Sequence, residues 1–132
     1  MLHLTASVFL SNVCHACVKG YYLYGLVFFI LFITSYINHS TPEEHKNKKI
    51  YNLIDKIFVW IVISVGFIYL LEISFPQNIL PLVSVGVVGI LWYKIKYTEE
   101  FHDYDINHCR KLHIILHLFS SIGHNAIMYA LV

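Results

Sequence analysis

Long uncharged stretches, separated by short charged loops, dominate the pattern of this chain. No Asp, Glu, Lys or Arg lies between Gly20 and Pro42, and a similar apolar run follows each polar loop. A helix needs about 20 residues to cross the ~30 Å hydrocarbon core of a bilayer. The pattern therefore predicts a single domain, residues 1–132, that is an all-α, polytopic transmembrane helical bundle with four or five spans. We place four spans at residues 21–38, 52–72, 79–96 and 112–132. Residues 1–18 are the candidate for a short additional span at the start of the chain.

Composition favours a membrane protein over a soluble globule. Of the 132 residues, 58% are hydrophobic and only 13% are charged, whereas soluble domains have about 25% charged residues. The formal net charge of +1 leaves no basic stripe for nucleic acid, so we expect no nucleic-acid partner. The three cysteines (Cys14, Cys17 and Cys109) match neither a disulfide framework nor a four-cysteine zinc site. We therefore expect an integral, multi-pass membrane protein.

The basic residues gather in two loops, and this determines the expected orientation. Three lysines lie between residues 39 and 49, and four basic residues lie between residues 94 and 111. The turn after Glu72 contains no basic residue. Because the cytoplasmic loops of membrane proteins are enriched in Lys and Arg, we expect both basic loops to face the cytosol.

This orientation brings polar side chains of three spans to one membrane depth at the cytosolic side. Ser35 and His39 end one span, and Asp55 enters the next span from the same side. His113 and His117 open the last span four residues apart, so both imidazoles share one helical face. Three neutral imidazoles with an open fourth position are typical of catalytic zinc. The pattern predicts Zn2+ bound by His39, His113 and His117, with Asp55 and Ser35 as catalytic residues that hold or deprotonate a water.

Two further histidines, and a different cofactor, are alternatives for this chemistry. His45 lies in the loop after His39 and competes with it as a ligand. His124 lies about two turns beyond His117. We interpret His124 as a hydrogen-bonding residue between helices rather than a ligand. A haem held by histidines of two spans would require two of them to face each other at matched depth.

The same residues carry a resemblance to a known superfamily. Ser35 and His39 form a Ser-x3-His motif, Asp55 ends the segment KKIYNLID, and residues 113–123 read HIILHLFSSIG. This order resembles the CREST superfamily of membrane hydrolases, which includes haemolysin III-type proteins, progestin and adipoQ receptors, and alkaline ceramidases. The resemblance implies zinc ligation by the three histidines, with the aspartate and the serine positioning the water.

The resemblance also implies an activity and a substrate class. It points to a zinc-dependent integral-membrane hydrolase that cleaves an amide or ester bond of a membrane lipid at the cytosolic face, as ceramidases do. Members of the superfamily have seven spans, so this chain would lack the counterparts of the fifth and sixth. A second copy of the chain or a partner subunit would then complete the substrate cavity. The alternative is a non-enzymatic, receptor-like or assembly protein that keeps the bundle and the metal.

Overall fold

The structure is a computed structural model that describes residues 2–101 and 106–131, and within these ranges it is all-helical, with no strand. The predicted all-α class is confirmed. Residues 1, 102–105 and 132 lie outside the described residues, and they include His102 of the second polar loop and the last residue of the span predicted at 112–132. The elements in chain order are α1 (Leu2–Thr5), η1 (Ala6–Val8), α2 (Phe9–Lys19), α3 (Tyr22–Ser40), α4 (Lys48–Leu70), α5 (Ile79–Phe101) and α6 (Ile106–Ala130).

Three helices are long and apolar enough to cross a membrane, and they match three of the predicted spans. These segments are Tyr22–Ser40, Lys48–Leu70 and Ile79–Tyr97. The stretches predicted as spans at 1–18 and 112–132 are helical over residues 2–18 and 112–130, but they are not among the three. The first is divided among α1, η1 and α2, and the second, α6, carries repeated polar residues. A total of four or five spans therefore stays a prediction.

The helices extend further into the polar loops than the hydrophobic pattern predicts. α4 begins at Lys48 instead of residue 52, α5 continues to Phe101, and α6 begins at Ile106 instead of residue 112. The polar segment at 97–111 contains neither Pro nor Gly, so it has no strong helix breaker. A change in hydropathy marks where a helix would leave an apolar environment, and the helix itself can continue into water.

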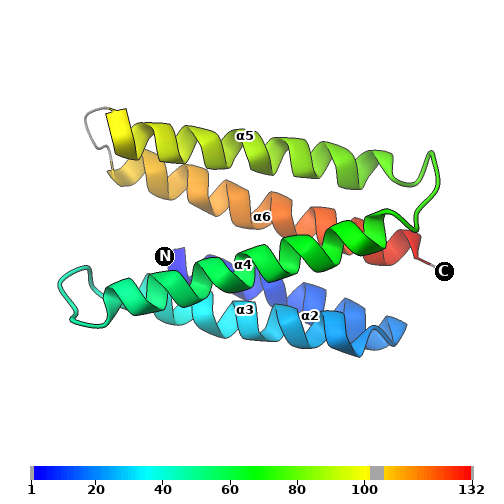
Figure 1. Ribbon diagram of the computed structural model, residues 1–132, viewed down its shortest axis with the longest axis horizontal. Coiled ribbons are helices and arrows are strands. Elements are labelled where there is room, and N and C mark those ends of the chain that lie inside the picture. Colours follow the sequence, from blue (N-terminus) through cyan, green and yellow to red (C-terminus); the bar gives the residue numbers. More distant parts are fainter. Residues whose placement is uncertain (1, 102–105, 132) are drawn as a thin grey trace.

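The N-terminal segment consists of α1, η1 and α2. It packs against both of the helical hairpins, α3–α4 and α5–α6 (Figure 1). α3 packs against α4, α5 packs against α6, and α2 packs against both α3 and α6. α4 makes a more limited contact with α6. Only 11% of the apolar, membrane-length stretch of α5 is buried inside the bundle. The rest of this stretch is available to contact lipid or another protein surface.

The first reversal of the chain is set by Gly20. This residue adopts a left-handed φ of +81°, which glycine reaches without the steric penalty of a side chain. The N–H of Gly20 bonds to the carbonyl of Cys17 at 3.1 Å, and the N–H of Tyr21 bonds to that of Ala16 at 2.8 Å. These bonds close α2 as a glycine-ended cap, and they turn the chain so that α3 packs back along α2.

The apolar core is centred on aromatic side chains of α3 and draws on four helices. Tyr24 and Phe28 are fully buried and belong to one cluster with Phe9 of α2, Val62 of α4 and Met128 of α6. Burial of apolar surface and close packing both favour this arrangement. The N-terminal segment is therefore part of the core of the bundle.

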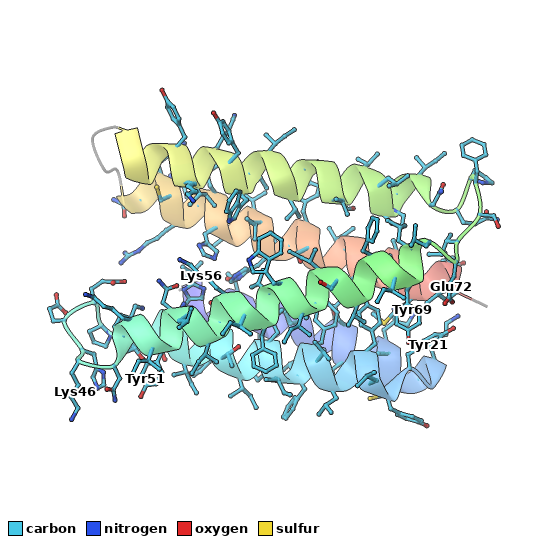
Figure 2. The ribbon with its side chains drawn as sticks, viewed as in Figure 1. Tyr21, Lys46, Tyr51, Lys56, Tyr69 and Glu72 are labelled. Carbon is cyan, nitrogen blue, oxygen red and sulfur yellow. The ribbon has the colours of Figure 1, made fainter. Side chains whose placement is uncertain are left out.

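The two ends of the bundle differ in charge and in aromatic content. Lys46 and Lys56 lie at the end where the α3–α4 loop closes the hairpin, whereas Tyr21, Tyr69 and Glu72 lie at the other end (Figure 2). The rings of Tyr21 and Tyr69 pack edge to face with centroids 5.4 Å apart. We call the end with Lys46 and Lys56 the lysine-bearing end. It is the end that the distribution of lysines predicts to face the cytosol.

Candidate metal centre

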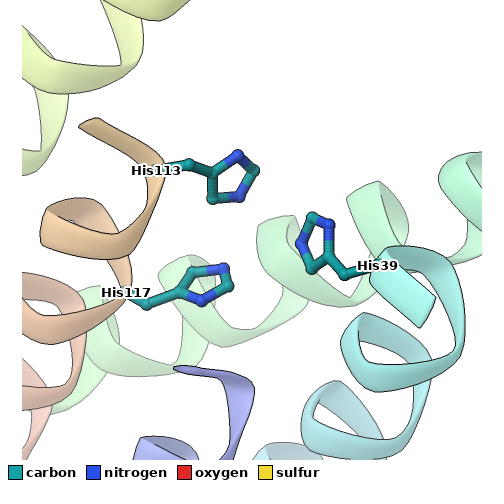
Figure 3. A group of neighbouring side chains, drawn as sticks. All are labelled: His39, His113 and His117. Atoms are coloured by element: carbon teal, nitrogen blue, oxygen red, sulfur yellow. The ribbon is translucent and has the colours of Figure 1, made fainter. Parts of the chain in front are cut away.

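Three histidines from two helices converge at the lysine-bearing end. His39 lies in the last turn of α3, and His113 and His117 lie one turn apart on α6. One ring nitrogen from each histidine forms a group in which all three atoms lie within 4.8 Å of one another. Figure 3 shows the three rings turned toward a common space. The structure therefore brings together the three residues that the sequence assigned to a zinc site, and we call them the histidine triad.

The N-terminal segment lies between the two helices that carry the triad. α1 packs against both α3 and α6, and η1 also contacts both helices. The edge of the His3 ring meets Tyr36 of α3, with the ring centroids 5.6 Å apart. On the other side, the ring of Phe9 lies 5.2 Å from that of His117. The spacing of the two ligand-bearing helices therefore depends on the first residues of the chain.

The donor atoms of the triad fit a metal ion. Nε2 of His39 is buried and has no hydrogen-bond partner among the described residues. Buried polar atoms normally have a partner, so such an exception calls for an explanation such as an ion or a water. Tetrahedral zinc with Zn–N bonds of about 2.1 Å holds its ligand nitrogens ~3.4 Å apart. Small rotations of the three rings would therefore bring the observed group to ligating distance.

The geometry also bears on a haem. The rings of His39 and His113 lie nearly perpendicular, edge to face, and their centroids are only 4.7 Å apart. A porphyrin between two axial histidines needs a wider gap, because each ring meets the iron end-on from an opposite face. The triad therefore fits a single small ion better than a haem.

A buried carboxylate on α4 is hydrogen-bonded to the residue that precedes His39 in α3. Asp55 is 7% exposed, and its Oδ2 accepts a hydrogen bond from the side-chain amide of Asn38 at 3.0 Å. The hydroxyl of Ser35 approaches the same carboxylate. Oδ1 of Asp55 and Oδ1 of Asn38 are both buried without a partner among the described residues. Buried acceptors without a partner are exceptions in folded proteins.

The sequence analysis missed Asn38, although the chain contains a signal for it. Asn38 follows Ser35 by three residues, which places both side chains on one face of α3 beside His39. The ammonium group of Lys48 donates to the carbonyl of Asn38 and, at 3.0 Å, to that of Thr41. A lysine from the first turn of α4 therefore holds the end of α3 on which the first triad residue lies.

The two alternative histidines lie outside the triad. His45 is exposed in the α3–α4 loop, where its ring stacks on Tyr51 with centroids 6.1 Å apart. His124 hydrogen bonds through Nδ1 to the hydroxyl of Tyr24, and its ring meets Phe28 edge-on with centroids 4.8 Å apart. The interpretation of His124 as a hydrogen-bonding residue between helices is confirmed.

A polar seam that the sequence analysis also missed continues from the triad along α6. Polar residues recur at every fourth position of this helix and so share one face, at His113, His117, Ser121 and Asn125. This face meets the N-terminal segment. The hydrogen-bonded pairs of the seam are Thr5 with His117 (2.8 Å), Asn12 with the Ser121 hydroxyl (2.8 Å) and carbonyl (3.0 Å), Ser11 with Asn125 (3.0 Å), and His15 with Asn125 (3.0 Å).

The fold and the site together define a class of protein. It is an all-helical protein with three helices that could cross a membrane and with a histidine triad that could hold a metal ion. No known protein family, no curated protein and no solved structure matches this chain. The similarity to the CREST superfamily stays a prediction from the residues named above.

Proposed function

We propose that this protein is a zinc-dependent, integral-membrane hydrolase that cleaves an amide or ester bond of a membrane lipid. The observation that carries the proposal is the convergence of three histidines, one of them with an unpartnered buried Nε2, at the lysine-bearing end of a helical bundle. Three imidazoles with an open fourth position are a ligand set of hydrolytic zinc. The apolar helices around the site would place membrane lipids beside it.

The neighbours of the triad have separate roles in the proposed reaction. Zinc in such a site lowers the pKa of a water to about 7 and polarises a carbonyl group. Asp55 holds the attacking water through its free Oδ1 and accepts its proton there. Asn38 orients this carboxylate by its 3.0 Å bond to Oδ2. The hydroxyl of Ser35 would donate a hydrogen bond to the oxygen of the water or to the developing oxyanion, and it would keep its proton.

The polar seam supports α6 as an additional span, which would bring the total to four, or to five with the N-terminal segment. A bare polar stripe on a helix is unfavourable in lipid, because its groups would lack hydrogen-bond partners. On α6 the stripe includes two triad histidines and faces the N-terminal segment, where Ser121 and Asn125 find partners. Low average hydropathy is therefore compatible with a helix whose polar face is covered by protein.

The sparse packing of two helices favours a second candidate function. Only 22% of the apolar, membrane-length stretch of α4 is buried inside the bundle, and only 11% of that of α5. A lipid hydrolase needs walls that hold its substrate over the metal, and a second copy or a partner subunit would have to provide them. The alternative is therefore a receptor-like or assembly protein that binds zinc without turnover.

The test is a zinc determination combined with a hydrolysis assay on the full chain, purified in detergent. We expect about one zinc per chain, the number that one three-histidine site binds. We also expect release of fatty acid from a ceramide or an acyl-ester lipid, lost on chelation and restored by zinc. The double substitution His113→Ala and His117→Ala removes both zinc and turnover, and His45→Ala is the matched control that keeps them. A folded, zinc-free wild type contradicts the proposal, whereas zinc without fatty-acid release favours the second candidate.

A further inference from the structure

The hydroxyl of Thr5 makes two short polar contacts at the end of α1. Its Oγ1 lies 2.7 Å from the carbonyl oxygen of Leu2 and 2.8 Å from Nδ1 of His117. A carbonyl oxygen can only accept, and a hydroxyl has a single proton to donate. If that proton pointed to the histidine, two oxygen atoms would face each other at 2.7 Å with no proton between them. The hydroxyl therefore donates to Leu2 and accepts the N–H of Nδ1.

This direction of the bond decides which nitrogen of His117 can bind a metal. With the proton on Nδ1, the neutral ring presents its lone pair on Nε2. His117 is 4% exposed, so bulk water does not compete for Nδ1. Ligating histidines usually donate their second N–H to an oxygen acceptor, which holds the ring and raises the basicity of the ligand.

We propose that Thr5 is a positioning residue, which sets the tautomer and the ring orientation of His117 and thereby the affinity of the triad for zinc. The inference rests on the proposed function, because it requires the triad to bind a metal. It gives the N-terminal segment a role in the chemistry of the site, beyond its part in the packing of the bundle.

The seam explains how a residue so early in the chain is held in place. Ser121 and Asn125 continue the spacing of His117 along α6, and they bond Asn12 and His15 of α2. The ligand-bearing face of α6 is therefore docked on the N-terminal segment over several turns. Thr5 lies at the end of this docked surface nearest the triad, and 112 positions of sequence separate it from His117.

The test compares three variants by zinc affinity, measured by competition with a chelator on the full chain in detergent. Thr5→Val keeps the shape of the side chain and removes the acceptor, and we expect a 10- to 100-fold weaker affinity, roughly the loss seen when second partners of ligating histidines are removed. Thr5→Ser restores the hydroxyl and most of the affinity. Ser11→Ala is the matched control, because it breaks a seam bond without touching the triad. It should lower thermal stability and leave zinc affinity unchanged.

A second measurement separates positioning from a general loss of structure. Nitrogen-15 NMR of the histidine rings in the zinc-free protein reports which nitrogen of His117 carries the proton. We expect Nδ1–H in the wild type and in Thr5→Ser, and a mixture of tautomers in Thr5→Val. If the wild type binds zinc and Thr5→Val matches it in affinity and tautomer, the inference is wrong and the proposed function stands. If the wild type is folded and binds no zinc, both are wrong.

Discussion

Helix α6 carries histidines at two sites, seven residues apart, whose surroundings differ in kind. His117 bonds to Thr5 through one nitrogen, and its ring lies among those of His39 and His113. His124 bonds to Tyr24, and side chains and backbone of α3 and α4 fill the space around its ring. Neither histidine is exposed, so shielding from solvent alone does not make a metal site. The difference is whether a ring nitrogen is left facing other ligands.

Close helix approach is what fills the space around His124. A Cβ on Gly66 of α4 would lie 2.4 Å from Cε1 of His124, so only glycine lets the ring fit there. At the triad, one ring nitrogen of each histidine instead lies within 4.8 Å of the other two. The His124 site is closed by packing, whereas the triad brings three possible ligand atoms together. The predictions below change one site and ask whether the other responds.

The largest expected effect is the loss of zinc from the triad alone. His117→Gln removes one of the three ligands, and we expect zinc content to fall from about one per chain to background. The variant His124→Gln should keep the zinc expected at the triad, because His124 bonds to Tyr24 outside the triad. Metal analysis of both proteins measures this, and equal zinc loss in the two variants would contradict the separation of the sites.

The next effect is on stability and arises at the closed site. Gly66→Val forces a side chain into the His124 ring, and overpacking of this kind costs about 1–3 kcal/mol. We expect a lower Tm and an unchanged zinc content in the protein that remains folded. Gly86→Ala on α5 is the matched control, since a Cβ there meets no atom within 4 Å. A wild-type Tm for Gly66→Val would contradict this prediction, because it would show that α4 and α6 can move apart without loss of stability.

A smaller effect is expected from the single hydrogen bond at the closed site. Tyr24→Phe removes the hydroxyl that bonds to His124 and keeps the ring in the core. Hydrogen bonds between membrane helices contribute about 0.6 kcal/mol on average and ~1.7 kcal/mol at most. Thermal unfolding in detergent should show a shift of this order, and Tyr22→Phe, at an exposed position, should show none. A change in zinc affinity in Tyr24→Phe would mean that the two sites are coupled.

The smallest effect is expected at the exposed loop histidine. His45→Ala removes a ring that stacks on Tyr51 outside the triad. Surface substitutions usually change stability by less than about 0.5 kcal/mol, and we expect no loss of zinc. Parallel measurements on His39→Ala give the contrast, because that variant loses a triad ligand. Zinc loss in His45→Ala with retention in His39→Ala would reverse the two roles.

Much of the fold follows from local rules. Hydropathy located the three apolar helices, because an apolar helix surface of this length must be buried or face apolar surroundings. Helical spacing put His113 and His117 on one face, and the alternation of loops put His39 at the same end. The helix ends were harder to predict, since the polar residues at 97–101 and 106–111 lower hydropathy and are still helical.

The sequence by itself determined the all-helical class, the apolar helices and the three histidines that meet. Each of these depends on periodicity or composition, which can be seen in the sequence without knowing how the helices pack. Only the tertiary structure decided that Thr5 bonds to His117, that Asn38 holds Asp55 and that Gly66 makes room for His124. These contacts join residues of different helices. Their formation depends on how closely and at what rotation the helices pack, which the pattern of one helix does not specify.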